Sequence, residues 1–276
     1  MTTKKFEKKE NKFKKKFKIG LCLSGGGARG FVYAGAFKAF EENGIKFDMV
    51  AGTSIGSMFG AMYASNMDYE EIVRKTKEIK RRDFKKFNFG FLPSKMDAMR
   101  ETINNILIVK NLEDLPIPYF AVAVDLITGK QIVFSSGDLA TVITASCAIP
   151  GVYLPVKYRN MNLIDGGVIN NVPADVLIEN GCDFVVTIDC NSTRGGKTSS
   201  ENFITQFMTS VSIMMVNNSQ KGIELSDIVI RPDTKNFSSL GVEDKDELMQ
   251  LGYLATIELM PAIKDLFIGK IKKKSD

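Results

Sequence analysis

The sequence predicts an α/β fold around a mainly parallel sheet, and three observations support this. Two apolar segments, 17–23 and 48–52, are each followed by a turn and then by a helical pattern. This strand–turn–helix rhythm places successive strands in a parallel sheet. The chain has 276 residues, enough for one sizeable domain with a buried core. Its composition, 44% hydrophobic and 25% charged, is ordinary for a globular protein.

Apolar runs and helix-end residues define the first four elements. Residues 17–23 (F-K-I-G-L-C-L) form the first strand, and a helix from Phe31 to Asn43 follows a glycine-rich turn. Gly44 after Asn43 is a typical helix C-cap. Residues 48–52 form the second strand, and a helix rich in small residues extends from Ser54 to about Ala64.

The next elements include a helix and a predicted β-hairpin. A helix is expected from Asp68 to about Arg82, because acidic residues in its first turn and basic residues at its end complement the helix dipole. Strands Tyr119–Asp125 and Lys130–Phe134 flank the turn residues Thr128-Gly129, which predicts a hairpin at one edge of the sheet.

The remaining sequence continues to alternate between helix and strand patterns. We expect helices near 96–107 and 138–147, a strand at 162–165, a helix at 174–180, a strand at 183–189, a Ser/Thr/Gly-rich loop at 191–200, a further helix, a strand at 227–231 and a long helix from about 243 to 267. The last helix belongs to a C-terminal helical extension over residues 233–276, which we expect to pack on the main domain.

Positive charge is concentrated at the N-terminus. Residues 1–18 hold nine lysines and two glutamates, a net charge of +7, whereas the whole chain carries +5. We therefore predict a basic, flexible arm over residues 1–16. Such an arm attracts an anionic lipid surface at about 1 kcal/mol per lysine, or nucleic acid, or it only improves solubility. A membrane surface is the partner we expect, and nucleic acid is not.

The sequence shows no sign of secretion, membrane spanning or metal binding. It has no apolar run of 18 or more residues, and no apolar segment follows the basic N-terminus, so we expect neither a transmembrane helix nor a signal peptide. The cysteines form no close metal-binding pair and are expected to be reduced, mostly buried thiols of a cytoplasmic protein. They are Cys22, Cys147, Cys182 and Cys190.

The pattern G-x-S-x-G occurs at 52–56, yet the chain contains no histidine. Placed between a strand and a helix, this pattern forms the sharp turn that carries the nucleophile of many serine hydrolases. Gly52 and Gly56 relieve crowding there, and the start of the helix favours an oxyanion. Ser54 is therefore a candidate nucleophile, although a serine before a helix is also a common N-cap. Without histidine, a Ser-His-Asp triad is excluded.

A glycine-rich turn at 24–30 (S-G-G-G-A-R-G) follows the first strand. Its glycines also fit the dinucleotide pattern G-x-G-x-x-G, but the acidic residue expected at the end of the second strand is missing, and so are the lysine and hydroxyl of a P-loop. Backbone N–H groups in such a turn suit an oxyanion hole as well as a phosphate cradle. Arg29 either fixes the turn or helps to hold a lipid phosphate.

A general base must then come from another residue, and Asp165 is the best candidate. It follows the apolar pair Leu163-Ile164 and precedes two glycines, which places it at a strand end beside a tight turn. An aspartate in this position is often only a turn residue. Four other aspartates near predicted element ends remain possible. They are Asp48, Asp125, Asp175 and Asp189.

These three segments, in this order, resemble the patatin-like phospholipase family, and in particular its bacterial type. The turn at 25–30 matches its G-G-G-x-R-G motif, residues 52–56 match its G-x-S-x-G motif, and residues 165–167 match its D-G-G motif. The segments A-S-C-A-I-P-G-V at 145–152 and N-N-V-P at 170–173 are also similar. The resemblance covers about residues 17–232, so it implies an acyl hydrolase domain with those bounds.

This resemblance implies a three-layer α/β/α sandwich and a serine hydrolase of phospholipase A type. Ser54 would be the nucleophile and Asp165 the general base. Gly25, Gly26, Gly27 and Arg29 would surround the oxyanion hole. No cofactor or metal is implied, and the substrate would be a phospholipid or another acyl lipid. A neutral-lipid esterase or thioesterase of the same fold is the alternative, and the oligomeric state stays open.

One further segment suggests contact with a membrane. Residues 81–92 (R-R-D-F-K-K-F-N-F-G-F-L) alternate phenylalanines with cationic residues and glycine, a mixture that suits an interfacial contact or a mobile lid. The alternative is that these phenylalanines fold into the core. They are Phe84, Phe87, Phe89 and Phe91.

Overall fold

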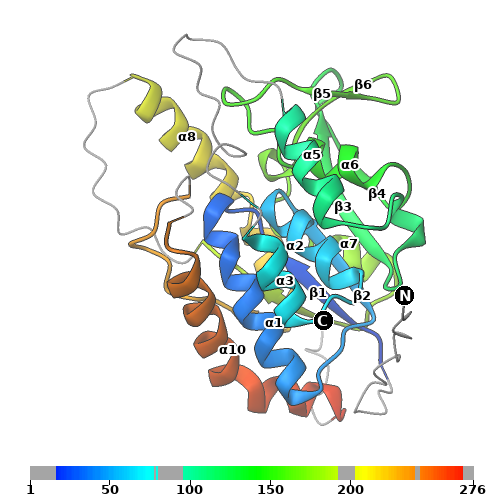
Figure 1. The fold of residues 1–276 in the computed structure, drawn as a ribbon, viewed down its shortest axis with the longest axis vertical. Coiled ribbons are helices and arrows are strands. Elements are labelled where there is room, and N and C mark those ends of the chain that lie inside the picture. The colour runs from blue at the N-terminus through cyan, green and yellow to red at the C-terminus, as the bar shows by residue number, and fades with distance from the viewer. Residues whose placement is uncertain (1–16, 78, 80–95, 192–202, 240–242, 270–276) are drawn as a thin grey trace, which may run out of the picture.

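The computed structural model describes residues 17–77, 79, 96–191, 203–239 and 243–269 (Figure 1). The strands are β1 (Ile19–Leu23), β2 (Met49–Thr53), β3 (Tyr119–Asp125), β4 (Lys130–Phe134), β5 (Val156–Tyr158), β6 (Met161–Asp165), β7 (Phe184–Ile188) and β8 (Ile228–Ile230). The α-helices are α1 (Val32–Asn43), α2 (Ile55–Ala64), α3 (Tyr69–Thr76), α5 (Asp97–Ile106), α6 (Leu139–Ser146), α7 (Ala174–Glu179), α8 (Phe203–Asn217), α9 (Gln220–Glu224) and α10 (Lys245–Phe267). Short 3-10 helices are η1 (Gly27–Phe31), η2 (Leu112–Asp114) and η3 (Gly166–Val168).

These strands form one mixed sheet in which hydrogen-bonded neighbours follow the path β5-β6-β3-β2-β1-β7-β8, with β4 also paired to β3. Neighbours from β3 to β8 are parallel, whereas β3–β4, β3–β6 and β5–β6 are antiparallel. The mainly parallel sheet predicted from the sequence is therefore confirmed. Strands β3 and β4 form the predicted hairpin, and β4 pairs with no other described strand.

Helices cover both faces of the sheet, as the side chains of β1 illustrate. Ile19, Leu21 and Leu23 point to one face, where they join a core that includes α1, α2 and α10. Cys22 points to the opposite face, where its neighbours include residues of α7. Because residues that alternate along a strand face opposite sides, a strand that is apolar throughout needs cover on both faces. The expected three-layer α/β/α sandwich is confirmed.

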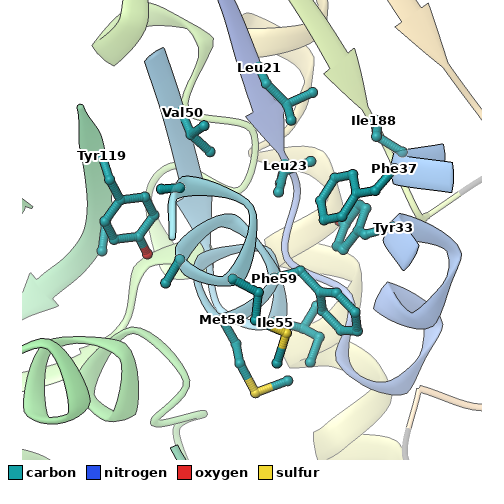
Figure 2. Close-up of a cluster of buried hydrophobic side chains, with 14 of the residues drawn as sticks. Leu21, Leu23, Tyr33, Phe37, Val50, Ile55, Met58, Phe59, Tyr119 and Ile188 are labelled. Carbon is teal, nitrogen blue, oxygen red and sulfur yellow. The ribbon is translucent and has the colours of Figure 1, made fainter. Parts of the chain in front are cut away.

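The larger core lies between the sheet and helices α1 and α2. Figure 2 shows Leu21, Leu23, Val50 and Ile188 of the sheet facing aromatic side chains of these helices. Phe59 of α2 makes edge-to-face contacts with two rings, at centroid distances of 5.7 Å to Phe31 and 5.7 Å to Tyr33. Such aromatic pairs add about 0.5–1.5 kcal/mol beyond area burial. This packing fixes the start of α2, where Ser54 lies.

The C-terminal helix α10 packs closely along α1 (Figure 1). Glycines permit the close approach: a Cβ atom on Gly35 of α1 would collide with the Met249 carbonyl, and one on Gly252 of α10 would collide with the Val32 carbonyl. Each glycine thus accepts the backbone of the opposite helix. This contact holds residues 245–267 against the rest of the domain.

Two local predictions differ from the structure. Strand β5 has no equivalent among the sequence predictions, because it has only three residues and is partly exposed, so it lacks a strong apolar pattern. Helix α3 ends at Thr76 rather than near Arg82. Its start agrees with the prediction, since the Asp68 side chain caps it by accepting the Glu71 N–H at 2.8 Å.

Candidate active site

Strand β3 brings Ser54 and Asp165 together. Its residues 121–125 pair with β4 on one side, so β2 and β6 must both lie on the other side. There Thr53, the last residue of β2, is opposite Val122, while Asp165, the last residue of β6, is opposite Ala123. The two strands therefore meet end to end along the same edge of β3. Ser54 follows Thr53 directly, so the predicted nucleophile and base are neighbours.

Ser54 occupies a strained turn between β2 and α2. Its φ of 55° and ψ of −127° lie in a region that residues other than glycine rarely adopt. A Cβ atom on Gly52 would meet the Gly56 carbonyl, and one on Gly56 would meet the carbonyls of Leu23 and Ser24. The glycines of the motif thus allow β1, β2 and α2 to approach each other closely. The Ser54 side chain is held beside the end of the sheet, with the residue only 4% exposed.

Asp165 is fully buried at 0% exposure. Its Oδ1 accepts the Gly167 N–H at 2.8 Å, while Oδ2 has no hydrogen-bond partner of normal geometry within the described part of the chain. Burial raises the pKa of Asp165 to about 7, and interactions with the Ser54 side chain and the Gly167 N–H oppose this rise. The Ser54 hydroxyl therefore interacts with the carboxylate but does not form a well-aligned hydrogen bond, as is common in unliganded active sites.

The four alternative aspartates have other partners. Asp48 accepts the Ile19 N–H at 2.8 Å, and Asp125 accepts the Thr128 hydroxyl at 2.8 Å within the β3–β4 turn. Asp175 contacts Lys221 Nζ at 2.8 Å, and Asp189 accepts the Asn191 N–H at 3.0 Å. The Ser54 side chain is one of the groups that influence the pKa of Asp165.

The glycine-rich turn runs beside Ser54. A Cβ atom on Gly25 would lie 3.2 Å from Ser54 Cβ. The Gly25 N–H donates to the Asn171 carbonyl at 3.1 Å, and the Asn171 side chain donates back to the Gly25 carbonyl at 3.4 Å. Among the described residues, nothing accepts a hydrogen bond from the N–H of Gly26 or Gly27. Two backbone donors are therefore available for an oxyanion, and Gly25 anchors the turn.

Residues 234–239, which precede α10, brace this turn. The Ala28 N–H donates to the Ser239 carbonyl at 2.8 Å, and Arg29 Nε donates to the Phe237 carbonyl at 3.0 Å. Arg29 thus fixes the turn, one of the two roles that the sequence left open. The Thr234 hydroxyl donates to the Cys190 carbonyl at 2.7 Å and joins the same segment to the end of β7.

An apolar pocket adjoins Ser54. Helix α2, helix α5 and residues 147–153 supply most of its lining, and Gly27 and Ser239 complete it. The pocket residues are Gly27, Ser54, Ile55, Met58, Met99, Cys147, Ile149, Val152, Tyr153 and Ser239. Burial, and secondarily the Asp165 charge, raise the pKa of the Cys147 thiol, so the thiol stays protonated. The pocket is suited to a hydrocarbon chain rather than to a charged group.

Sequence reasoning missed several residues of this site. The pocket side chains could not be assigned, although Cys147, Ile149 and Val152 lie in the A-S-C-A-I-P-G-V segment that carried part of the family resemblance. Ser146, which bonds to the Ser54 backbone, lies in the same segment. The proposed membrane contact at Phe84, Phe87, Phe89 and Phe91 and the arm at 1–16 lie outside the described residues.

The described residues show neither a metal-binding cluster nor a membrane-spanning helix. Within that part of the chain, no cluster of three or more His, Cys, Asp or Glu side chains is arranged to hold a metal ion. Across the same residues, no helix combines the length and apolar character needed to cross a bilayer. All four cysteines lie within the described residues, where they are buried and form no disulfide bond.

Comparison with known proteins places these features in context. A family model described as patatin-like phospholipase matches residues 21–178. Patatin-like phospholipase domain-containing protein 6 of Homo sapiens is 36% identical over 189 residues, which cover 63% of this chain and 13% of that protein. Neuropathy target esterase sws of Drosophila melanogaster is 34% identical over 184 residues, covering 63% of this chain and 13% of the fly protein. The chain thus spans only a small part of these relatives.

Solved structures agree on the fold. VipD from Legionella pneumophila superimposes with a TM-score of 0.62 at 16% identity, covering 89% of this chain and 67% of VipD. Human GIVD cytosolic phospholipase A2 superimposes with a TM-score of 0.55 at 12% identity, covering 90% of this chain and 59% of the human protein.

Proposed function

Because the chain belongs to the patatin-like phospholipase family, we propose that it is a lipid acyl hydrolase of phospholipase A type that uses Ser54 and Asp165 as a catalytic dyad. One observation carries the proposal. The strained, buried Ser54 lies against a buried carboxylate whose pKa is raised to about 7, next to a turn with two available N–H donors. A nucleophile, a base near neutral pKa and an oxyanion hole are the parts that acyl transfer needs.

The proposed reaction has two steps. Asp165 accepts the Ser54 proton as Oγ attacks the ester carbonyl, and the Gly26 and Gly27 N–H groups stabilise the oxyanion. Protonated Asp165 gives the proton to the leaving alcohol, which leaves an acyl-enzyme on Ser54. A water molecule then loses a proton to Asp165, attacks the acyl group and releases the fatty acid as Ser54 regains its proton.

Burial of Asp165 compensates for the low basicity of aspartate in a dyad without histidine. An ordinary aspartate is about 2.6 pKa units less basic than histidine, which corresponds to about 3.5 kcal/mol of driving force for proton transfer. A pKa of about 7 removes this deficit. Each oxyanion-hole donor contributes a further 3–4 kcal/mol, roughly, to stabilisation of the transition state.

The apolar pocket supports an acyl chain as the part of the substrate that is bound beside Ser54. It does not distinguish a phospholipid from a neutral lipid, so a neutral-lipid esterase or thioesterase is the second candidate. Substrate presented in a membrane would require the protein to bind at the membrane surface, and the basic N-terminal arm would favour an anionic surface. This makes peripheral membrane association part of the proposal.

Fatty-acid release from phospholipid vesicles tests the proposed function. Wild type and Ser54→Ala are compared on mixed anionic and neutral vesicles and on a soluble p-nitrophenyl ester. We expect wild type to release fatty acid from the vesicles and Ser54→Ala to lose at least about 10³-fold in rate on both substrates. Cleavage of the soluble ester alone would favour the esterase alternative. Equal rates for both proteins would contradict a role for Ser54.

The pH dependence of kcat/KM should report ionisation of Asp165. The base must be deprotonated to accept the Ser54 proton, so activity should rise with pH and level off above about 7. Below this pH, kcat/KM should fall about tenfold per unit. The measurement uses the soluble ester from pH 4.5 to 9, with circular dichroism to confirm that the protein stays folded. A midpoint near 4, the ordinary value for aspartate, would contradict the raised pKa.

A further inference from the structure

The backbone N–H of Ser54 needs a hydrogen-bond acceptor, and neither residue of the catalytic dyad supplies one. Strand β2 ends at Thr53, and the strained conformation of Ser54 turns the chain out of the strand, so that no backbone carbonyl among the described residues accepts the Ser54 N–H. A buried N–H without an acceptor costs about 1–3 kcal/mol. At the same place β3 loses β2 as its partner, while β6 begins to pair only at Ala123. The Ser54 N–H and the Val122 carbonyl, on either side of this gap, therefore each need another hydrogen-bond partner.

The Ser146 hydroxyl, at the end of α6, fills this gap. Its Oγ accepts the Ser54 N–H at 2.9 Å and donates to the Val122 carbonyl at 2.6 Å. A Cβ atom on Gly166 would collide with the same Val122 carbonyl, so this carbonyl points toward the junction of β2 and β6. Ser146 has an exposed fraction of 0%, so bulk water does not reach this bridge.

A second serine provides a contrast. The Ser57 hydroxyl donates to the Ser54 carbonyl at 2.6 Å. That carbonyl also accepts the Ser57 N–H at 2.8 Å, so it keeps a partner when the hydroxyl is removed. The Ser54 N–H has no such second partner among the described residues. Ser146 and Ser57 therefore bond to opposite ends of the same residue, and only the contact made by Ser146 lacks a substitute.

We propose that Ser146 is a positioning residue for the reaction, an inference that rests on the proposed function of Ser54. Its hydroxyl holds the amide of the strained nucleophile against β3, and so sets the position of Ser54 Oγ relative to Asp165 and the glycine turn. Asp165 lies opposite Ala123, the residue after Val122, so the bridge ties Ser54 to the same stretch of β3 that positions Asp165 by strand pairing. Loss of the bridge lets the turn relax and misaligns Oγ, without removing any group that contacts the acyl chain.

Steady-state kinetics on a soluble ester test this role, with Ser57→Ala as the matched control. Ser146→Ala should lower kcat about 10- to 100-fold with KM within about twofold of wild type, since small displacements of reacting groups cost about this much. Ser57→Ala should keep kcat within about threefold of wild type. A fluorophosphonate that labels Ser54 provides a second readout. The final extent of labelling measures the number of folded sites. The rate of labelling should fall in parallel with kcat.

The possible results separate the role of Ser146 from the proposed function of Ser54. If wild type and Ser54→Ala hydrolyse the ester equally, both the dyad and the role of Ser146 are wrong. If wild type shows Ser54-dependent activity but Ser146→Ala retains its kcat per labelled site, the role of Ser146 alone is overturned. Equal losses in Ser146→Ala and Ser57→Ala would also overturn it. Should Ser146→Ala not fold, Ser146→Cys retains a weak donor and acceptor and is expected to show an intermediate kcat, and a wild-type kcat would contradict the proposal.

Discussion

Asp165→Asn is expected to lower kcat by about 10³- to 10⁴-fold, because asparagine cannot accept the Ser54 proton. The substitution preserves size, and an amide oxygen in the place of Oδ1 still accepts the Gly167 N–H. KM for a soluble ester should therefore change little. Hydrolysis measured at pH 8 gives the loss in kcat, and fluorophosphonate labelling should slow in parallel. Activity within tenfold of wild type would rule out Asp165 as the base.

The same substitution should stabilise the protein. Folding raises the pKa of Asp165 from about 3.9 to about 7, so the fold disfavours the ionised carboxylate. Wild type then loses stability as pH rises from about 4 to about 7 and stays at this lower level above it, whereas Asp165→Asn avoids the loss. We expect the variant to have the higher free energy of unfolding at pH 8, by up to a few kcal/mol, with little gain at pH 4. Urea denaturation at both pH values measures the difference, and the absence of any gain at pH 8 would contradict it.

Gly27→Ala is the second substitution with a large expected effect. Gly27 has a φ of +60°, and a Cβ atom there would collide with the Ser239 carbonyl that braces the turn. The turn must shift, and with it the Gly27 N–H proposed to bind the oxyanion. Loss of one such donor lowers kcat by about 10²- to 10³-fold. Kinetics on the soluble ester should show this fall in kcat with a smaller change in KM.

Gly129→Ala is the matched control for this prediction. Gly129 has a φ of +66°, close to that of Gly27, but no atom lies within 4 Å of a Cβ placed on it. Both substitutions carry the cost of alanine in a left-handed conformation, about 1–2 kcal/mol. Only the change at Gly27 should reduce kcat. Equal kinetic effects at the two positions would mean that general destabilisation, rather than the oxyanion hole, explains the loss.

The sequence predicted those features whose physical origin is local. The glycines at 25–27, 52 and 56 mark places where another segment lies too close for a side chain, and the strand–turn–helix pattern around Ser54 predicts its turn. The D-G-G motif placed Asp165 at a strand end, where the structure has it. Such features depend on a few neighbouring residues, so a sequence motif can carry them.

Features that depend on distant contacts could not be predicted. Nothing local to Ser146 indicates that its hydroxyl joins the Ser54 amide to β3, because the three segments meet only in the folded sheet. Gly25, Gly26 and Gly27 are equivalent in the sequence, and only the bond to Asn171 separates the first from the other two. The raised pKa of Asp165 likewise results from burial by several elements rather than from its neighbours in the chain.

The position of β1 has a consequence for synthesis of the protein on the ribosome. Of the described strands this one is translated first, yet it lies inside the sheet, where Ile19–Leu23 pair with β7 at Phe184–Ile188. Until β7 has been translated, the nascent chain carries an apolar strand with one open edge, a species prone to aggregate. A fragment limited to residues 21–178, the family-model region, would keep that edge open permanently. Recombinant versions of this domain should therefore extend beyond β7.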